Sequence, residues 1–381
     1  MKTLLHISKY YYPDLGGIET VAMYLAEGLT IDARTKAGFH NVVICFSTDK
    51  QYHEDEIRGV KVYRVPVNFS FMSQDVAFSY DTILKKVIRE YKPFAVHVHC
   101  PNPFVYPLVC SSVGKETKVV LHWHSDILSK GMMYHIIKPF ENAILKRADI
   151  IISTSPNYIP HSKPLQKYPD KVRVAQNGLI TSNFDLRPGD EEKIAEIRKQ
   201  YEGKKIVFYC GRHIPYKGID NLIKADAFIK GDCVILIGGK GPIDEELKAI
   251  PCSDRVKFLG RLPDDDLRQY LHAADIFAFP SNTKAEAFGI ALAEAMYCRC
   301  APVSFVIEGS GVNWVSVDKQ TGIVVPLNDV QAFAKAIDTL IADDVLRKMY
   351  AEAARRRVID NFTTEAAVEA ITRVYSELER K

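Results

Sequence analysis

Residues 206–229 read IVFYCGRHIPYKGIDNLIKADAFI and carry the pattern that decides the fold. The apolar run Ile206–Tyr209 predicts a short buried strand, and a polar loop bounded by Gly211 and Gly218 follows it. Residues Ile219–Ile229 then predict an amphipathic helix. A buried strand followed by such a helix is the repeating βα unit of a parallel sheet. The segment therefore predicts one βα unit with a glycine-bounded loop at the carboxyl end of its strand.

The same alternation extends over nearly all of the 381 residues, which leave room for two domains. We predict an α/β fold with two doubly wound parallel sheets. Strands are expected at Leu4–Ser8, Val42–Phe46, Val60–Arg64, Ala95–His99, Lys118–His122, Ile150–Ser153 and Val172–Ala175 in the first half, and at Ile206–Tyr209, Val234–Ile237, Val256–Leu259, Ile276–Phe279, Ala301–Ser304 and Ile323–Val325 in the second.

The domain boundary is expected at Leu186–Asp190, where Pro188 and Gly189 precede a charged helix. After Val325 the pattern is helical only, and it ends in a long helix over Thr364–Arg380. The predicted domains are therefore residues 1–188, residues 189–362 and a final helix over 363–381.

Composition narrows the class of protein. Hydrophobic residues make up 47% and charged residues 25% of the chain, as in ordinary globular proteins. No apolar run approaches the roughly 20 residues that span a bilayer, and the first residues lack the apolar core of a secretion signal. The eight cysteines follow no disulfide or zinc spacing, which is typical of a reducing cytosol. We expect a cytoplasmic protein.

Charge is shared unequally between the two halves. Residues 1–190 hold 23 Lys and Arg against 18 Asp and Glu, whereas the net charge of the whole chain is only +3. A basic first half suggests an anionic substrate or an anionic membrane surface. The excess is too small to indicate nucleic acid.

The first glycine turn follows the first expected strand. Gly16 and Gly17 precede an amphipathic helix, so the backbone can approach a ligand closely and the first N–H groups of the helix can bind an anion. An ordinary tight turn between strand and helix would show the same two residues.

Histidines gather where two strands of the first half end. His122, His124 and Asp126 could ligate a metal, but no fourth ligand is evident. A hydrogen bond from His124 to a substrate is the favoured interpretation, and His122 is expected on the opposite side of its strand. His97 and His99 are expected to be core residues or a minor contact on the acceptor side.

Two cations lie in the loop that follows Ile206–Tyr209. Arg212 and Lys217 offer a planar fork and a point charge, a combination that suits a diphosphate. The next strand also ends in a glycine turn, Gly238–Pro242, in which Gly239 is a candidate ligand contact. No Gly-x-Gly-x-x-Gly fingerprint is present, so binding of a nicotinamide dinucleotide is disfavoured.

Two glutamates follow the strand Ile276–Phe279. Glu286 lies in a polar loop, and Glu294 lies on a helix face that otherwise looks buried. A buried carboxylate needs a partner or a ligand. The pair could also be the acid and nucleophile of a glycoside hydrolase, depending on their separation.

Taken together in order, these motifs resemble the retaining GT-B glycosyltransferases of family 4, the glycosyltransferase group 1 type. The resemblance extends over nearly the whole chain and rests on Gly16–Glu19, His124–Asp126, Asn177–Gly178, Gly211–Arg212, Lys217–Gly218, Gly239–Pro242, Phe258–Arg261 and Glu286 with Glu294. It implies a GT-B architecture of two Rossmann-like domains that face each other across a cleft, the first on the acceptor side and the second binding the donor. It also implies that the final helix over 363–381 crosses back to the first domain.

The resemblance also implies roles for single residues. Catalytic roles fall to His124, Glu286, Arg212 and Lys217. The nucleoside diphosphate sugar donor would contact Gly16, Gly17, Arg212, Lys217, Gly239, Arg261, Glu286, Phe288, Gly289, Ile290 and Glu294. A glycan or lipid-linked glycan acceptor would lie near Tyr12, Asn102 and Asp126.

The expected reaction is metal-independent transfer of a hexose with retention, in bacterial surface polysaccharide or lipid-linked oligosaccharide synthesis. Two cations at the leaving diphosphate supply charge that a metal would otherwise bring, so we expect no metal or other cofactor. The acidic run Asp264–Asp266 is interpreted as helix capping. The basic amphipathic stretch Lys130–Arg147 suggests peripheral binding to the inner face of a membrane. A catalytically inert sugar-nucleotide-binding subunit or a nucleotide-sugar epimerase remains as an alternative.

Overall fold

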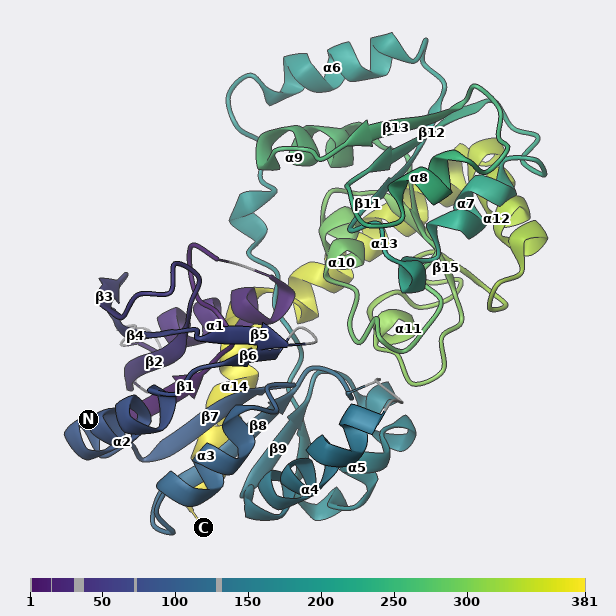
Figure 1. Ribbon diagram of the computed structural model, residues 1–381. Helices are drawn as coiled ribbons and strands as arrows, with labels where there is room; N and C mark the ends of the chain where they lie inside the picture. The colour runs from purple at the N-terminus through teal and green to yellow at the C-terminus, as the bar shows by residue number, and fades with distance from the viewer. Residues whose placement is uncertain (1, 15, 31–37, 72–73, 128–131, 381) are drawn as a thin grey trace. The chain divides into compact units, whose positions relative to one another are not determined.

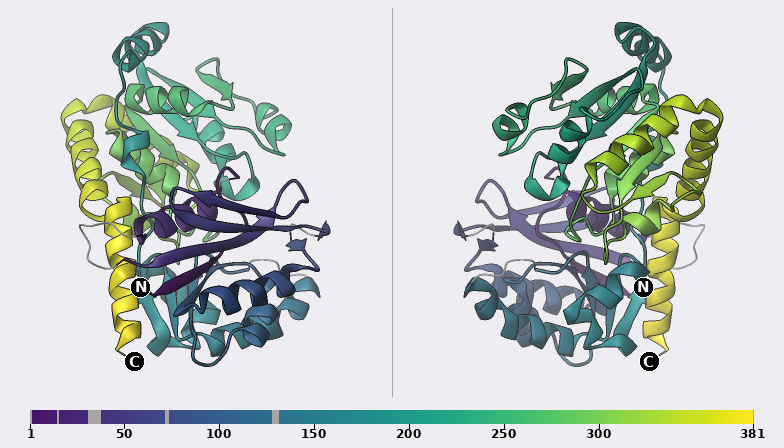
Figure 2. Two further views of the ribbon diagram at one scale, coloured as in Figure 1. Left: turned by 90° about the vertical axis from the view of Figure 1, so that its left-hand side faces the viewer. Right: turned by 90° about the vertical axis from the view of Figure 1, so that its right-hand side faces the viewer.

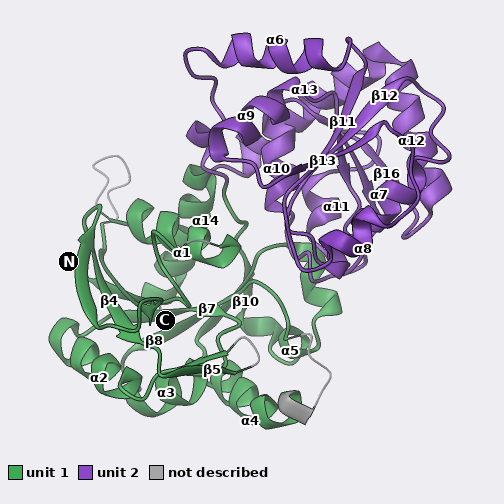
Figure 3. Cartoon of the chain, turned by 45° about the horizontal axis from the view of Figure 1, so that its top comes forward, with its two compact units in different colours: residues 1–178, 364–381 green, residues 179–363 purple. Residues whose placement is uncertain are grey.

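The computed structural model describes residues 2–14, 16–30, 38–71, 74–127 and 132–380. The chain forms two compact units, residues 1–178 with 364–381 and residues 179–363 (Figure 3). Each is an α/β unit built on a mainly parallel sheet, as the alternating pattern predicts. Among the described residues, no helix combines the length and the apolarity that crossing a bilayer demands.

The first unit contains an eight-stranded sheet in the order β10-β9-β8-β7-β1-β2-β4-β3, in which only β3 is antiparallel to its neighbour. Its strands are β1 (Thr3–Ile7), β2 (His40–Ser47), β3 (His53–Ile57), β4 (Val60–Pro66), β7 (Ala95–Cys100), β8 (Lys118–Trp123), β9 (Ile150–Ser153) and β10 (Val172–Val174), and a separate hairpin joins β5 (Phe69–Phe71) to β6 (Gln74–Val76). Its longer helices are α1 (Gly17–Gly28), α2 (Tyr80–Tyr91), α3 (Val105–Ser112), α4 (Met132–Arg147) and α14 (Thr364–Glu379).

The second unit contains a six-stranded, all-parallel sheet in the order β13-β12-β11-β14-β15-β16. Numbered within the unit, this is the order 3-2-1-4-5-6 of the dinucleotide-binding Rossmann fold. The strands are β11 (Lys205–Cys210), β12 (Cys233–Gly238), β13 (Val256–Gly260), β14 (Ile276–Phe279), β15 (Ala301–Phe305) and β16 (Ile323–Val325). The helices are α6 (Asp190–Gln200), α7 (Ile219–Ala225), α8 (Asp244–Lys248), α9 (Asp264–Ala273), α10 (Ile290–Tyr297), α11 (Val312–Val315), α12 (Val330–Ala342) and α13 (Asp344–Asn361) (Figure 1).

Every strand predicted from the apolar runs is present, with ends that differ by at most two residues. The pattern missed β3, because its sequence HEDEI is polar and alternates between half-buried and exposed side chains at the edge of the sheet. It also missed the hairpin of β5 and β6, whose strands have only three residues each. Strand β3 and the β5–β6 hairpin lie outside the buried core. Hydrophobic periodicity predicts strands of the core and does not predict such segments.

The boundary between the units lies at residues 178 and 179, so the predicted boundary at 188 is wrong by the length of one short segment. The backbone N–H of Leu179 donates to the carbonyl of Phe362 at 2.7 Å. Leu179 and Phe184 are buried in the core of the second unit. The segment therefore belongs to the second unit because of contacts with residues far along the chain.

The last helix, α14, belongs to the first unit, as the predicted final helix does (Figure 2). It lies beside α1 and buries Val368, Ile371, Val374 and Leu378 in a core that includes Leu4 and Ile152 of the sheet. Arg173 holds its far end, because the guanidinium contacts Glu377 at 2.5 Å. One face of the first sheet is thus closed by a segment that follows the entire second unit in sequence.

We predict that Ile371→Ala destabilises the first unit by about 2–5 kcal/mol, the usual cost of truncating a buried aliphatic side chain. Ile371 is 1% exposed in the core that α14 completes. Urea unfolding in a Trp314→Phe background would leave Trp123, in the first unit, as the only tryptophan.

The matched control is Glu369→Ala on the same helix, where the side chain is 71% exposed. This variant is expected to stay within about 0.5 kcal/mol of the parent. Equal effects of the two substitutions would contradict docking of α14 on the first unit.

Candidate functional site

Four loops meet at one edge of the second sheet. Because the carboxyl ends of parallel strands lie together, the order β13-β12-β11-β14 places the loops that contain Arg261, Gly239, Arg212 and Glu286 side by side in that order. The order of the sheet reverses between β11 and β14, which is where open α/β sheets bind ligands. The structure therefore gathers the predicted donor-binding loops at one edge.

Glycines allow these loops to pack against each other at backbone distance. Gly239 has φ +117°, and a Cβ there would lie 1.9 Å from the carbonyl oxygen of Gly211. Gly218 has φ +61°, and a Cβ there would lie 2.2 Å from the carbonyl oxygen of Pro280. Any other residue would push the loops apart.

His213 braces two of the loops, a role that the sequence did not reveal. Its ring Nδ1 lies 2.6 Å from a carboxylate oxygen of Asp244, and its backbone N–H donates to the carbonyl of Lys240. Asp244 also accepts the N–H of Gly241 at 2.8 Å. The sequence did not indicate this contact, because Asp244 lies 31 residues from His213.

Lys217 and Glu286 form a partly buried ion pair. The ammonium of Lys217 lies 2.5 Å from Glu286 Oε2, and the hydroxyl of Ser281 donates to the same oxygen at 2.9 Å. The side chains are only 14% and 10% exposed. In this structure the cation predicted to bind diphosphate is therefore held by the carboxylate predicted to bind the sugar.

Glu294 of α10 titrates near neutrality. Burial raises the pKa of its carboxyl group to about 7, the charge of Lys217 acts to lower it, and Asp264 adds to the rise. Lys217 thus acts on both glutamates.

The start of α10 is built as a tight cap. Gly289 precedes the helix with φ +88°, and Ile290 is its first residue. The ring of Phe288 is buried against Trp314 and Phe362. The hydroxyl of Ser310 donates to the carbonyl of Glu286, which ties the loop to the next segment and is a further contact that the sequence did not predict.

Arg212, Lys240 and Arg261 are exposed cations at this edge. Neither guanidinium has a carboxylate partner among the described residues. An arginine that is not paired with protein acids can bind an anionic ligand without first breaking an ion pair. The two arginines differ in this respect from Lys217.

The remaining predicted residues lie at the carboxyl edge of the first sheet. Gly16 caps α1 and Gly17 is its first residue. Tyr12 is 39% exposed and lies under the guanidinium of Arg58. Asn102 follows β7, is 4% exposed, and has an amide Nδ2 without a hydrogen-bond partner.

Asp126 forms hydrogen bonds with other residues of the first unit. Its Oδ1 accepts hydrogen bonds from the indole of Trp123 at 2.9 Å and from the hydroxyl of Ser162 at 2.6 Å. These contacts anchor the loop after β8. They do not bring Asp126 into a metal site with His122 and His124, since the only group of potential ligands among the described residues consists of His97, His99 and His122.

His122 and His124 share one face of the sheet, so the prediction that His122 points the other way is wrong. The ring centroids lie 4.2 Å apart and the rings stack. Residues two apart on a strand necessarily share a face. His124 is 6% exposed, and burial lowers its pKa to about 3, so its ring is neutral at pH 7.

Each of the two units matches a known protein family. Residues 15–183 match the family model described as Glycosyltransferase Family 4, and residues 190–357 match the model described as Glycosyl transferases group 1. The chain is similar in structure to the Anabaena protein HepE, solved with UDP and glucose, at a TM-score of 0.75 and 19% identity over 99% of this chain and 100% of the other.

Two curated relatives match most of the chain. The O-antigen chain mannosyltransferase C of Escherichia coli is 29% identical over 98% of each protein, and the D-rhamnosyltransferase WbpZ of Pseudomonas aeruginosa is 30% identical over 88% of this chain and 85% of its own. The likeness in sequence, the two family models and the two Rossmann-like units agree. The chain belongs to the family 4, group 1 type of glycosyltransferases and has the GT-B fold.

Proposed function

We propose that this glycosyltransferase transfers a hexose, with retention and without a metal, from a nucleoside diphosphate sugar to a hydroxyl of a glycan or lipid-linked glycan. The observation that carries the proposal is the edge of the second sheet at which Lys217, Glu286, Glu294 and Arg212 meet two glycine loops. The UDP complex of HepE supports a nucleotide-sugar donor.

The leaving diphosphate would be bound by Arg212 and Lys217. Negative charge develops on the diphosphate as the bond to the sugar breaks, and preorganised cations lower the barrier where that charge forms. Arg212 has no carboxylate partner among the described residues, so it could bind a phosphate without breaking an ion pair. Lys217 would exchange part of its contact with Glu286 for a contact with a phosphate oxygen. The same exchange frees Glu286 Oε2 to accept a hydroxyl of the donor sugar.

Glu294 would accept hydrogen bonds from the ribose hydroxyls. Its partial burial and its pKa near 7 mean that the ionised carboxylate lacks a full set of partners in the unliganded protein. Two hydroxyl donors from a ribose would supply them. Stabilisation of the carboxylate by the ligand is therefore part of the binding free energy.

Retention would follow from attack on the same face that the leaving group departs. No side chain in the described part of the second unit stands out as a covalent nucleophile, since both glutamates have the roles given above. A phosphate oxygen of the departing diphosphate would accept the proton of the acceptor hydroxyl. His124, Gly16 and Gly17 would contact the sugar and its phosphates, and Tyr12, Asn102 and Asp126 would line the acceptor side.

The O-antigen mannosyltransferase and the rhamnosyltransferase among the relatives favour a polysaccharide of the bacterial surface as the product. A lipid-linked acceptor would lie at a membrane, and α4 offers a surface that fits one. Ile136 is 58% and Phe140 43% exposed on this helix, close to the exposed Lys138. Ile144 faces the core instead, so the described surface that fits an interfacial helix lies within residues 134–140. Lys130, at the start of the predicted basic stretch, lies outside the described residues.

Arg212→Ala and Lys217→Ala are each expected to lower kcat about tenfold to a hundredfold. Each removes a charge-assisted contact to the leaving diphosphate, worth about 1.5–3 kcal/mol. Steady-state release of nucleoside diphosphate with a lipid-linked glycan acceptor measures the effect.

The exposed Lys248, which pairs with exposed Glu245, gives the matched control Lys248→Ala. Near-native kinetics for both folded site variants would refute the assignment of the diphosphate.

Treatment with EDTA is expected to leave the rate of transfer largely unchanged. The protein cations already supply the positive charge at the leaving group. Transfer is assayed before and after dialysis against EDTA, and after readdition of Mg²⁺ or Mn²⁺. A complete loss that a metal reverses would show that the reaction needs a metal.

Glu294→Gln is expected to stabilise the second unit at pH 8 by on the order of 1–3 kcal/mol. The raised pKa means that the ionised carboxylate is disfavoured in the folded state, so this destabilisation grows as pH rises from about 4.5 to about 7. The gain of the variant should therefore vanish near pH 4.5. Thermal unfolding at both pH values measures it.

The same variant is expected to bind nucleoside diphosphate more weakly at pH 8, which calorimetry would show. Glu245→Gln, at a side chain that is 88% exposed, is the control for both measurements. A Glu294→Gln variant that is less stable than the parent at pH 8 would mean that the carboxylate already has a native partner.

A further inference from the structure

Five histidines stack on the face of the first sheet that α14 covers. This histidine ladder consists of His6 on β1, His97 and His99 on β7, His122 on β8 and His124 directly after it. Neighbouring ring centroids lie as close as 4.7 Å for His97 with His99 and 4.2 Å for His122 with His124. All five side chains are buried, from 0% to 6% exposed.

The ladder is neutral at pH 7. Burial lowers the pKa of His6 to about 4 and the pKa of His97, His99 and His122 well below the usual value. A neutral imidazole carries its proton on one nitrogen and accepts at the other. The hydrogen bonds of the ladder therefore determine which nitrogen of each ring is the donor.

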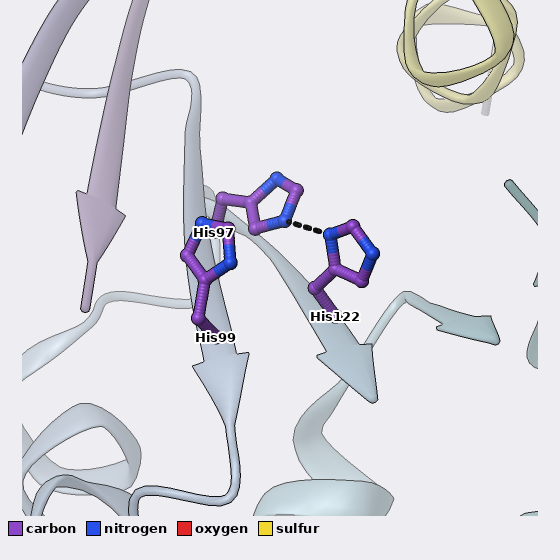
Figure 4. Close-up of side chains that lie close together, drawn as sticks. All are labelled: His97, His99 and His122. Carbon is purple, nitrogen blue, oxygen red and sulfur yellow. Dashed lines mark hydrogen bonds between the residues drawn. The ribbon is translucent and has the colours of Figure 1, made fainter. Parts of the chain in front are cut away.

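A metal ion is the first alternative for such a cluster, since His97, His99 and His122 each offer a nitrogen within 4.8 Å of the others (Figure 4). However, the ring planes of His97 and His99 differ by 21°, and those of His99 and His122 by 24°. The lone pair of an imidazole lies in the ring plane, so the two stacked pairs direct their lone pairs side by side, whereas tetrahedral ligation needs them to converge. The rings of His97 and His122 are tilted by 45°, and their facing nitrogens are already joined by a hydrogen bond.

The surroundings also oppose a cation. No carboxylate among the described residues hydrogen bonds to these three rings, so the charge of a divalent ion would be uncompensated. His97 Nε2 and His122 Nδ1 lie 3.2 Å apart and form a hydrogen bond, and Tyr375 of α14 lies 2.6 Å from His97 Nδ1. The cluster is organised as a hydrogen-bonded stack.

The proton of His6 is located by its partner. His6 Nε2 lies 3.1 Å from Asn41 Oδ1, and the amide nitrogen of Asn41 donates to the carbonyl of Phe39, which fixes the orientation of the amide. His6 must therefore donate from Nε2. Its Nδ1 has no partner and is consequently an unpaired acceptor.

The same reasoning applies to His99 and His124. His99 Nδ1 lies 3.1 Å from His124 Nε2, and His99 Nε2 is buried without a partner. A buried N–H without a partner is rarer than a buried acceptor without one. His99 therefore carries its proton on Nδ1 and donates to His124 Nε2, which leaves the proton of His124 on Nδ1.

The remaining nitrogen of His124 is placed differently from the unpaired nitrogens of the ladder. His6, His99 and His122 each have a buried nitrogen without a partner and are at most 1% exposed, whereas His124 is 6% exposed and its Nδ1 is not among the buried unpaired atoms. His124 follows β8 at the carboxyl edge, where ligands of such sheets bind. An N–H at this atom can reach a ligand.

We propose that His99 is a positioning residue that holds His124 as the Nδ1–H tautomer, so that His124 is a fixed hydrogen-bond donor to an oxygen of the bound sugar nucleotide. The ligand part of this inference rests on the proposed function. The ring of His124 then cannot accept the proton of the acceptor hydroxyl at Nδ1, and its Nε2 lone pair is occupied by His99. The histidine orients the donor and leaves proton acceptance to the departing phosphate.

The test is a long-range ¹H–¹⁵N correlation spectrum of the full chain labelled with ¹⁵N-histidine, without ligand at pH 7, with signals assigned from single His→Gln variants. We expect His124 and His99 to be protonated on Nδ1 and His6 on Nε2. His99→Asn keeps an amide N–H near the position of Nδ1, whereas His99→Leu removes the donor. His6→Gln, which keeps an amide N–H near Nε2, is the control and should leave the signals of His124 unchanged.

In His99→Leu, the Nδ1–H tautomer of His124 should no longer dominate, and kcat should fall about tenfold with little change in the KM of the donor. His99→Asn should restore both the tautomer and most of the rate. Rescue by this variant separates positioning from a loss of packing, because asparagine fills the site less well than leucine but keeps the donor.

Two results would overturn the proposal. One is protonation of His124 on Nε2 in the unliganded parent protein. The other is a stoichiometric metal ion in the purified protein, found by elemental analysis, whose removal shifts the signals of the ladder. Because the tautomers are read without substrate, a failure of the proposed glycosyl transfer would leave the spectra to decide this inference separately.

Discussion

A parallel sheet must be covered on both faces, and this constraint shapes both units. Each strand must be followed by a segment that crosses back over one face, so every return loop lies at an edge of the sheet. In the second unit this places the loops after β13, β12, β11 and β14 together, with Arg212 and Glu286 on neighbouring loops. The grouping of these side chains follows from the need to cover both faces of the sheet. Arg212 and Glu286 are 74 positions apart in sequence and share an edge only when the sheet has formed.

Charge at this edge is balanced within the protein. Lys217 pairs with Glu286, and its charge acts to lower the pKa of Glu294, so the cation that would bind the leaving group interacts with both acids. A partly buried ion pair has lost water from both partners, and it remains favourable only while its geometry holds. Tight glycine loops and the brace of His213 on Asp244 provide that geometry. A ligand with its own negative charge and hydroxyl groups can replace the internal contacts without leaving either charge exposed to an apolar surrounding.

The first unit differs from the second in that it buries polar rings on one face of its sheet. Below the carboxyl edge the sheet is apolar, with Leu4, Val120 and Ile152 in the core that α14 closes. Closer to the edge, five stacked histidines replace the aliphatic side chains, and hydrogen bonds among His97, His122 and Tyr375 satisfy much of their polarity. The second unit interrupts the chain between the sheet and α14, so the tyrosine that contacts this stack comes from the last helix.

The sequence by itself determined the strands of both cores, the glycine loops and the family, because apolar runs and short motifs are local properties. It also identified Arg212, Lys217, Glu286 and Glu294 as candidates by type and position. Only the tertiary structure decided that Lys217 binds Glu286, that Leu179 joins the second unit through Phe362, and that His122 shares a face with His124. The contact between His97 and Tyr375 joins residues 278 positions apart. Such pairings, and the pKa shifts that burial causes, arise from packing between distant segments, which no local pattern encodes.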